Sequence, residues 1–335
     1  MENDRLIKRR ILLLMSLLVM VTLIPIAALS GVYKIDVYTL FYSRGTIMHE
    51  IFINLRLPRI VLALLLGGSL SWSGAIMQGL FRNPIVDPGL AGITAGASLF
   101  AGVGIVFGHF LPFLSSMWSL VVFSFFGSLV TGFSILFLAR QNGKSEVYNL
   151  LLIGIAVNAI CYSAIGLLSY IANDAQLRNL SFWNLGSLGG ANWNSIGHFG
   201  PFLILPIFFS PFLYRKFNAF SLGEPQAFHL GISVESLKNL SLVLIGISVG
   251  AAVSLTGTIN FVGIVVPHMV RLLIGQDYKF LLPITYILGG SLLLLSDTIS
   301  RTILAPTEIP VGIITALIGA PFFLFILYQN RKGKI

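Results

Sequence analysis

The amino-acid sequence predicts an all-α integral membrane protein with about ten transmembrane helices. Hydrophobic residues make up 56% of the 335 residues and charged residues only 10%, whereas soluble domains carry about 25% charged residues. The mean hydropathy is +0.90. Apolar runs of about 20 residues, which suffice to cross the hydrocarbon core as a helix, recur along the chain. Because no polar stretch is long enough to fold separately, we expect a single transmembrane domain over residues 1–335.

The predicted spans follow one another in order along the chain. They are residues 11–32, 58–80, 92–111, 117–139, 147–171, 197–214, 238–256, 258–274, 280–296 and 311–328. The first follows Arg5, Lys8, Arg9 and Arg10, as the apolar part of a signal peptide would. Because it has the length of a full span, we interpret it as a retained helix.

Lysine and arginine indicate the orientation, because cytoplasmic loops carry an excess of both. With the N-terminus placed inside, 15 of the 21 basic residues lie inside and 6 lie outside. Both termini are therefore expected in the cytoplasm. The net charge of +9 follows from this asymmetry and gives no reason to expect nucleic-acid binding.

Two connections are longer than a turn, residues 215–238 on the inner side and 172–196 on the outer side. Loops of this length usually carry function or structure of their own. Glycines spaced four residues apart occur at Gly92/Gly96, Gly104/Gly108 and Gly246/Gly250. They favour close helix packing, which we expect inside one subunit rather than in a dimer.

The motifs of enzymes and of nucleotide-binding loops are missing from the sequence. Gly143-Lys144-Ser145 lacks the glycine that a phosphate-binding loop carries five residues earlier, so we do not expect this chain to bind ATP. None of the five histidines pairs at metal-ligand spacing. The single cysteine, Cys161, is expected to be a small buried residue. We therefore predict no catalytic residue, no metal site and no cofactor in this chain, and transport is the default function.

Five motifs occur in order along the chain. They are Arg56-Leu57-Pro58-Arg59; Arg82-Asn83-Pro84-Ile85-Val86-Asp87-Pro88-Gly89; Phe182-Trp183 with Gly186-Ser187-Leu188; Phe261-Val262-Gly263-Ile264-Val265-Val266-Pro267-His268 with Arg271; and Glu308-Ile309-Pro310-Val311-Gly312 leading to Gly319-Ala320-Pro321-Phe322. Together they resemble the FecCD-type permeases, which import ferric siderophores, haem and vitamin B12. The resemblance extends from about residue 50 to residue 328.

This resemblance implies the fold of a type II ABC importer permease, a ten-helix subunit that forms a homodimer in the bacterial plasma (inner) membrane. Two copies of a separate ATPase, which hold the ATP and Mg, would bind on the inside, and a substrate-binding protein would dock on the outside. The permease would convert closure of the ATPases into alternating access. Spans two to five and seven to ten would be inverted relatives.

The expected substrate is a metal chelate. The external stretch Asp174–Trp193, and especially Leu177–Trp183, is most similar to haem permeases of the family, which favours haem over a ferric siderophore. Vitamin B12 (cobalamin) is the alternative. An ion-coupled secondary transporter is a more distant alternative, because it would need carboxylates inside the spans. A receptor or structural protein is disfavoured by the motifs at both faces.

Three arginines are candidates for docking the binding protein: Arg56, Arg59 and Arg301. In the family, arginines at these motif positions pair with acidic residues of the binding protein, and a guanidinium group suits bidentate bonds to a carboxylate. One alternative is anchoring to lipid headgroups. For Arg301, another is a local ion pair with Asp297, four residues earlier.

The inner segment 218–231 is predicted to form two short helices with a break. Ser221 would cap the second in a capping box with Glu224, Pro225 would lie in its first turn, and Gly231 would end it. The family places its ATPase-coupling helices here, and an apolar face would fit a groove on the ATPase. The alternative is an amphipathic helix on the lipid surface. The residues expected to couple are Leu222, Gly223, Glu224, Ala227, Phe228, Leu230 and Gly231.

The fifth span supplies the candidates for the gate and the pathway. Val147 and Tyr148 match the position of the family's inner gate, although the B12 importers have small hydroxyl residues there. Asn158 lies among apolar residues and needs a polar partner. It either lines the pathway or joins helices, and the sequence leaves both open.

Overall fold

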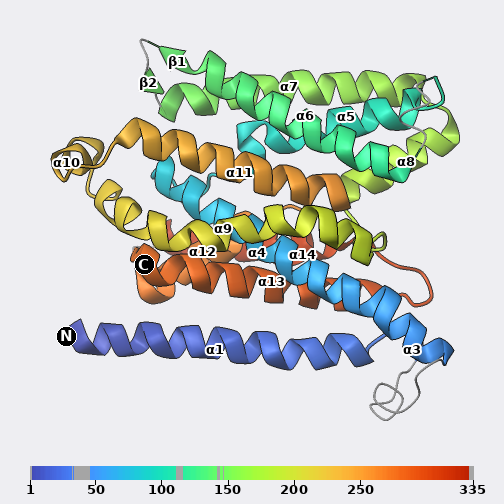
Figure 1. Cartoon of the computed structure of the whole chain (residues 1–335), viewed down its shortest axis with the longest axis horizontal. Coiled ribbons are helices and arrows are strands. Elements are labelled where there is room, and N and C mark those ends of the chain that lie inside the picture. The colour runs from blue at the N-terminus through green and yellow to red at the C-terminus, as the bar shows by residue number, and fades with distance from the viewer. Residues whose placement is uncertain are drawn as a thin grey trace.

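The computed structural model shows a helical bundle and describes residues 2–31, 33, 46–110, 116–141, 144, 145 and 147–331. Most of the long helices lie roughly side by side (Figure 1). The elements in chain order are α1 (Glu2–Leu29), α3 (Ile47–Ile51), the π-helical turn η1 (Phe52–Arg56), α4 (Leu57–Leu80), the 3-10 turn η2 (Pro88–Ala91), α5 (Ile93–Phe107), α6 (Met117–Leu138), the strands β1 (Arg140–Gln141) and β2 (Lys144–Ser145), α7 (Val147–Ile171), α8 (Asp174–Leu185), α9 (Trp193–Phe220), α10 (Glu224–His229), α11 (Val234–Thr256), α12 (Val262–Ile274), α13 (Tyr278–Thr302) and α14 (Val311–Arg331).

Each of the ten predicted spans coincides with one of these helices, which confirms the all-α fold class. Within the described ranges, seven helical segments are long and apolar enough to cross a membrane, and three apolar helices are shorter: α5, α12 and residues 311–325 of α14. Among the described residues, the only strands are the two-residue pair β1 and β2, which form an antiparallel hairpin.

The two ends of the bundle differ in their elements. Figure 1 places the start of α1, the β1–β2 hairpin and α10 at one end, and α3 and α8 at the other. We call the first the basic end, because most of the lysines and arginines belong to it, and the second the α8 end. The two long connections thus carry one short helix each, at opposite ends.

The short helices α5 and α12 support the predicted inverted repeat. Each is the second helix of its half, and they have 15 and 13 residues. Each begins after a residue with left-handed backbone, Gly92 (φ 76°) and Phe261 (φ 70°). They run in opposite directions, because the end of α5 accepts a hydrogen bond from Gln176 of α8, whereas the end of α12 accepts one from Arg9 of α1.

Glycines bring α4 into backbone contact with its neighbours at the centre of the bundle. A Cβ atom added at Gly74 would lie 1.8 Å from the carbonyl oxygen of Gly263 in α12, and one at Gly67 would lie 2.2 Å from that of Gly289 in α13. No side chain fits at such distances, because interiors are already close-packed. In the continuous helical segment α3–α4, 83% of the most apolar 18-residue stretch is buried, whereas in α1 the corresponding share is 17%.

The glycine pairs noted in the sequence pack helices within this one chain. A Cβ atom at Gly96 would lie 1.9 Å from Oγ1 of Thr131, and one at Gly250 would lie 2.0 Å from Oγ of Ser128. These contacts hold α5 and α11 against α6. Gly246, the partner of Gly250 in its motif, has no neighbour within 4 Å. The glycine contacts thus support packing inside one subunit.

Candidate functional site

Two arginines at the α8 end cap the C-terminus of α1. Arg56, the last residue of η1, donates a hydrogen bond of 2.7 Å to the carbonyl of Ala28. Arg301, in the last turn of α13, donates to the carbonyls of Ala27 at 2.8 Å and Ser30 at 2.9 Å. The last carbonyls of a helix lack intrahelical donors and form the negative end of its dipole. The two guanidinium groups therefore stabilise the end of α1.

A buried carboxylate joins two of the three candidate arginines. Asp297 is 0% exposed. Its Oδ1 accepts a 2.8 Å bond from Nε of Arg59, and its Oδ2 accepts a 3.1 Å bond from Nε of Arg301. Arg59 also pairs with Glu308 at 2.9 Å. The local Arg301–Asp297 pair considered from the sequence is therefore present, and Arg59 shares the same carboxylate.

The three arginines and Glu308 line a cleft of about 290 Å³ at the α8 end, and Asp297 lies buried beneath them. Arg56 and Arg301 are only 6% and 7% exposed, whereas the side chain of Glu308 is 45% exposed. Three guanidinium groups face two carboxylates, so the cluster keeps a net positive charge. Docking of a binding protein by these arginines stays a prediction, and the described contacts show them bonded within the subunit.

The segment predicted to couple to an ATPase forms α10 and projects at the basic end (Figure 1). Ala227 is fully buried and faces the bundle, whereas Leu222, Phe228 and Leu230 are 66%, 70% and 62% exposed. Phe228 lies on α10, and Leu222 and Leu230 flank it; exposed apolar side chains on a short anchored helix and its ends suit a groove on a partner. The coupling role itself stays a prediction.

The buried ammonium group of Lys238 anchors α10 to α11. It lies 2.9 Å from the carboxylate of Glu224 in the first turn of α10 and 3.2 Å from that of Glu235 in α11. Both carboxylates are partly exposed. The sequence indicated Lys238 only as one of the basic residues that set the orientation. The ion pair was not predictable, because Glu224 is 14 residues away.

The predicted N-terminal cap of α10 is wrong. The cap residue is Gly223 (φ 137°), without a side-chain hydrogen bond, and Ser221 instead ends α9 and donates to the carbonyl of Asn218. The expected first of two short helices is the last turn of α9. Pro225 lies in the first turn, as predicted. Gly231 (φ 81°) follows the C-cap, so the predicted stop is confirmed.

The gate and pathway candidates lie along α7. Val147 is its first residue, and the side chain of Tyr148 is 69% exposed. Asn158 donates a 2.9 Å hydrogen bond from Nδ2 to the carbonyl of Gly89 in η2. The amide therefore joins α7 to the segment after α4, in agreement with the interpretation that Asn158 joins helices. A gating or pathway role for these three residues stays a prediction.

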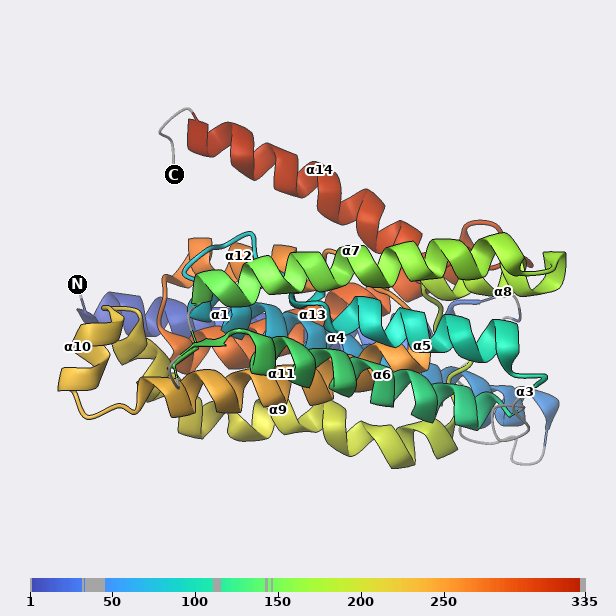
Figure 2. The ribbon, with the colours of Figure 1, turned by 90° about the horizontal axis from the view of Figure 1, so that it is seen from above.

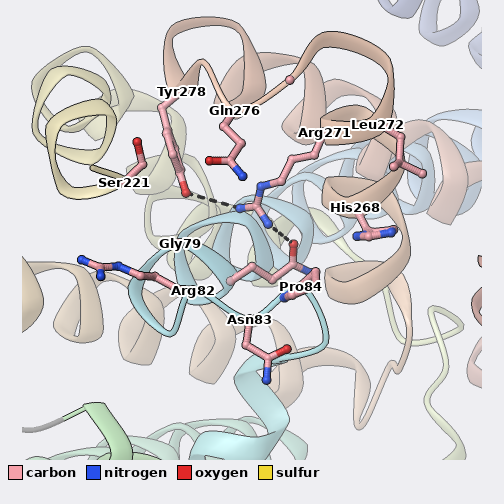
Figure 3. A pocket seen from close by; sticks show the side chains of 12 residues that line it. Gly79, Arg82, Asn83, Pro84, Ser221, His268, Arg271, Leu272, Gln276 and Tyr278 are labelled. Atoms are coloured by element: carbon pink, nitrogen blue, oxygen red, sulfur yellow. Dashed lines mark hydrogen bonds between the residues drawn. The ribbon is translucent and has the colours of Figure 1, made fainter. Parts of the chain in front are cut away.

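A pocket of about 510 Å³ opens at the basic end between α4, α12 and the start of α13 (Figure 3). At its centre, Arg271 donates to Oε1 of Gln78 at 2.5 Å, to the carbonyl of Ala75 at 2.7 Å and to the hydroxyl of Tyr278 at 3.4 Å. Sequence reasoning quoted Arg271 in a motif but missed Gln78 and Tyr278. The motif residues Arg82, Asn83 and His268 also line this pocket. Their presence in the motifs is the sequence feature that could have indicated it.

Comparisons with known proteins agree with this arrangement. The FecCD transport family matches residues 11–329. The hemin transport system permease protein HmuU of Yersinia pestis is 42% identical over 330 residues, which cover 98% of each chain. The cobalamin import system permease protein BtuC of Halobacterium salinarum is 39% identical over 283 residues, 83% of this chain and 73% of that protein.

A solved structure gives the same result at the level of the fold. It is reported as an inward-facing conformation of a metal-chelate type ABC transporter, and it matches with a TM-score of 0.85 and 30% sequence identity over 95% of this chain and 98% of that one. These relatives are membrane transport components rather than enzymes. The chain therefore belongs to the FecCD transport family and is a membrane permease of the ABC transporter type.

Proposed function

We propose that this chain is the permease subunit of an ATP-driven importer of a metal-chelate nutrient, with haem favoured over a ferric siderophore. The observation that carries the proposal is the 42% identity to a hemin permease along 98% of both chains. The similarity to a cobalamin permease at 39% identity supports the broader class and makes cobalamin the alternative cargo.

A second copy of this chain would complete the membrane part of the transporter. Figure 2 shows α14 diverging from the other helices toward the basic end. Leu317 and Leu324 on this helix are 67% and 66% exposed. A helix that leaves its own bundle loses packing contacts, and in lipid such contacts are what drives helix association. The partner copy would supply them, with the pathway along the dimer axis.

Two ATPase subunits would bind at the basic end, where Phe228 of α10 and the flanking residues Leu222 and Leu230 are exposed. They would hold the ATP and Mg. The excess of lysine and arginine at this end supports a cytoplasmic location for it and for both termini in the plasma membrane. ATP-driven closure of the ATPases would then be transmitted through α10 to the helices that alternate access.

A substrate-binding protein would dock at the α8 end, over the cleft that Arg59 and Glu308 line. The net positive charge of the cluster favours an acidic partner.

Arg59→Gln should weaken association with the binding protein about tenfold or more, since one desolvated charge pair is lost. Glu308→Gln should strengthen association, because it frees one side of Arg59. Arg178→Gln, an exposed basic residue of α8, is the matched control. Equal effects of all three variants would exclude docking at this cleft.

The deciding experiment is reconstitution in liposomes with a cognate ATPase and a cognate substrate-binding protein. ATP-dependent uptake of haem, a ferric siderophore and cobalamin would be measured side by side. Uptake of haem in excess of the other two is expected, and preferential uptake of cobalamin would select the alternative. Absence of uptake of every metal chelate would refute the assignment.

The same liposomes test the ion-coupled alternative. A secondary transporter would move its cargo on an ion gradient without ATP. The buried carboxylate of Asp297 is engaged by two arginines, which supports the ATP-driven mechanism over an ion site. Uptake that persists without ATP and stops when an ionophore collapses the gradient would support the secondary transporter instead.

A further inference from the structure

The pocket at the basic end has the charge of an anion-binding site. Arg82, His268 and Arg271 line it, and none of the described residues of its lining is acidic. Figure 3 shows the guanidinium group of Arg271 near the middle, with Arg82 on one side and His268 on the other. Arg82 follows α4, whereas His268 and Arg271 lie on α12, so the fold brings two segments far apart in the sequence to one cavity.

The partners of Arg271 among the residues that the structure describes are all neutral. Its bonds to Gln78, Ala75 and Tyr278 end on an amide oxygen, a carbonyl and a hydroxyl. They use three of the five N–H donors of the guanidinium group. Among the described residues, no carboxylate forms a salt bridge with Arg271 or with Arg82. A partly buried cation without a counter-charge favours the entry of an anion.

Arg82 and His268 add donors around the same cavity. Arg82 is exposed and donates a 3.1 Å bond to the carbonyl of Phe220, which leaves most of its N–H groups available. Nε2 of His268 is buried and has no hydrogen-bond partner among the described residues. Buried polar atoms normally have a partner. A ligand with several acceptor oxygens, such as a phosphate group, would accept hydrogen bonds from the free N–H groups of Arg271, and Arg82 would add positive charge at the edge of the same cavity.

We propose that this pocket binds the phosphate headgroup of an anionic phospholipid. The basic end is expected to face the cytoplasmic leaflet, where anionic lipids are enriched, and basic pockets between transmembrane helices on that side bind such headgroups. Leu272, in the pocket lining, and the adjacent Leu273 are 43% and 42% exposed. They offer an apolar surface for an acyl chain beside the charged cavity. The site requires neither the ATPase nor a transported substrate.

Native mass spectrometry of the purified full-length protein tests this proposal. The protein is titrated with phosphatidylglycerol and, separately, with phosphatidylcholine of the same acyl chains. We expect retention of phosphatidylglycerol in preference to phosphatidylcholine. Arg82→Gln should weaken phosphatidylglycerol binding about fivefold, the effect of one basic group at a membrane surface. Lys279→Gln removes an exposed cation of α13 that lies outside the pocket lining, and it should change binding less than about twofold.

Arg271→Gln is the stronger variant, but it also removes contacts between α4 and α12, so the exposed Arg82 carries the test if that variant does not fold. Equal retention of the two lipids would overturn the proposal. An effect of Lys279→Gln as large as that of Arg82→Gln would overturn it as well. Inorganic phosphate is the third probe, and saturable phosphate binding without any lipid preference would assign the pocket to a soluble anion and reject the lipid.

Discussion

Replacement of Asp297 by asparagine should destabilise the protein by about 3–5 kcal/mol, the usual cost of removing one partner from a buried ion pair. The carboxylate is 0% exposed and lies 2.8 Å from Arg59 and 3.1 Å from Arg301. Asparagine keeps the shape but removes the charge. Two guanidinium groups, 11% and 8% exposed, would then face each other without a counter-charge.

Glu308→Gln is the matched control in the same cluster. Its carboxylate also lies 2.9 Å from Arg59, but the side chain is 45% exposed. Exposed ion pairs contribute only about 0–1 kcal/mol, because water and salt screen them. Both substitutions therefore remove a carboxylate from Arg59, but Asp297 is buried and also bonds Arg301, whereas Glu308 is exposed.

Thermal unfolding in detergent, followed by tryptophan fluorescence, measures both variants. We expect Asp297→Asn to lower the Tm by roughly 5–10 °C and Glu308→Gln by less than about 2 °C, using the entropy of unfolding of a large domain. Salt should reduce only the effect of Glu308→Gln. An equal loss of Tm in the two variants, or an unchanged Tm in Asp297→Asn, would refute the structural role of the buried carboxylate.

Three further predictions concern the packing of the bundle and α10. Gly74→Ala should destabilise the protein by at least about 1–3 kcal/mol in the same assay, because the new Cβ would overlap a backbone carbonyl of α12, whereas Gly246→Ala, with free space around it, should be nearly neutral. Phe228→Ala should lower co-purification of the ATPase about tenfold or more without a loss of Tm, and Phe208→Ala, a similarly exposed phenylalanine on α9, should change neither. Unchanged co-purification in Phe228→Ala would remove α10 from the interface. Lys238→Gln should accelerate amide hydrogen exchange in α10 about tenfold, since it removes the link to α11, and unaltered exchange would show that packing alone holds this helix.

The helices were predictable from the sequence because each span depends on the apolar residues of its own segment. A run of apolar residues of the right length becomes a span whatever its neighbours do. Local rules also predicted Pro225 in the first turn of α10 and Gly231 after its end. The cap at Ser221 failed because α9 continues to Phe220, which is 1% exposed. Burial of that side chain holds the last turn of α9, and a pattern of neighbouring residues does not contain this information.

The candidate sites were predictable in position but not in bonding. Motifs placed Arg56, Arg59 and Arg301 at one face, and the family resemblance implied a role for them. Only Asp297, four residues from Arg301, was recognisable as a partner, because that spacing brings side chains together on a helix. The bond from Arg59 to the same carboxylate spans 238 residues of sequence, and the pocket around Arg271 likewise joins α4 to α12 and α13.

The sequence by itself determined the fold class, the ten apolar segments and the family, because hydropathy and short motifs are properties of contiguous residues. Only the tertiary structure decided which charges are paired. It joined Asp297 to two arginines and placed Arg271 and Arg82 in a pocket whose described lining contains no acidic residue. The physical reason is that a charge in a low-dielectric interior is governed by groups within a few ångströms, and the chain brings those groups together from distant helices.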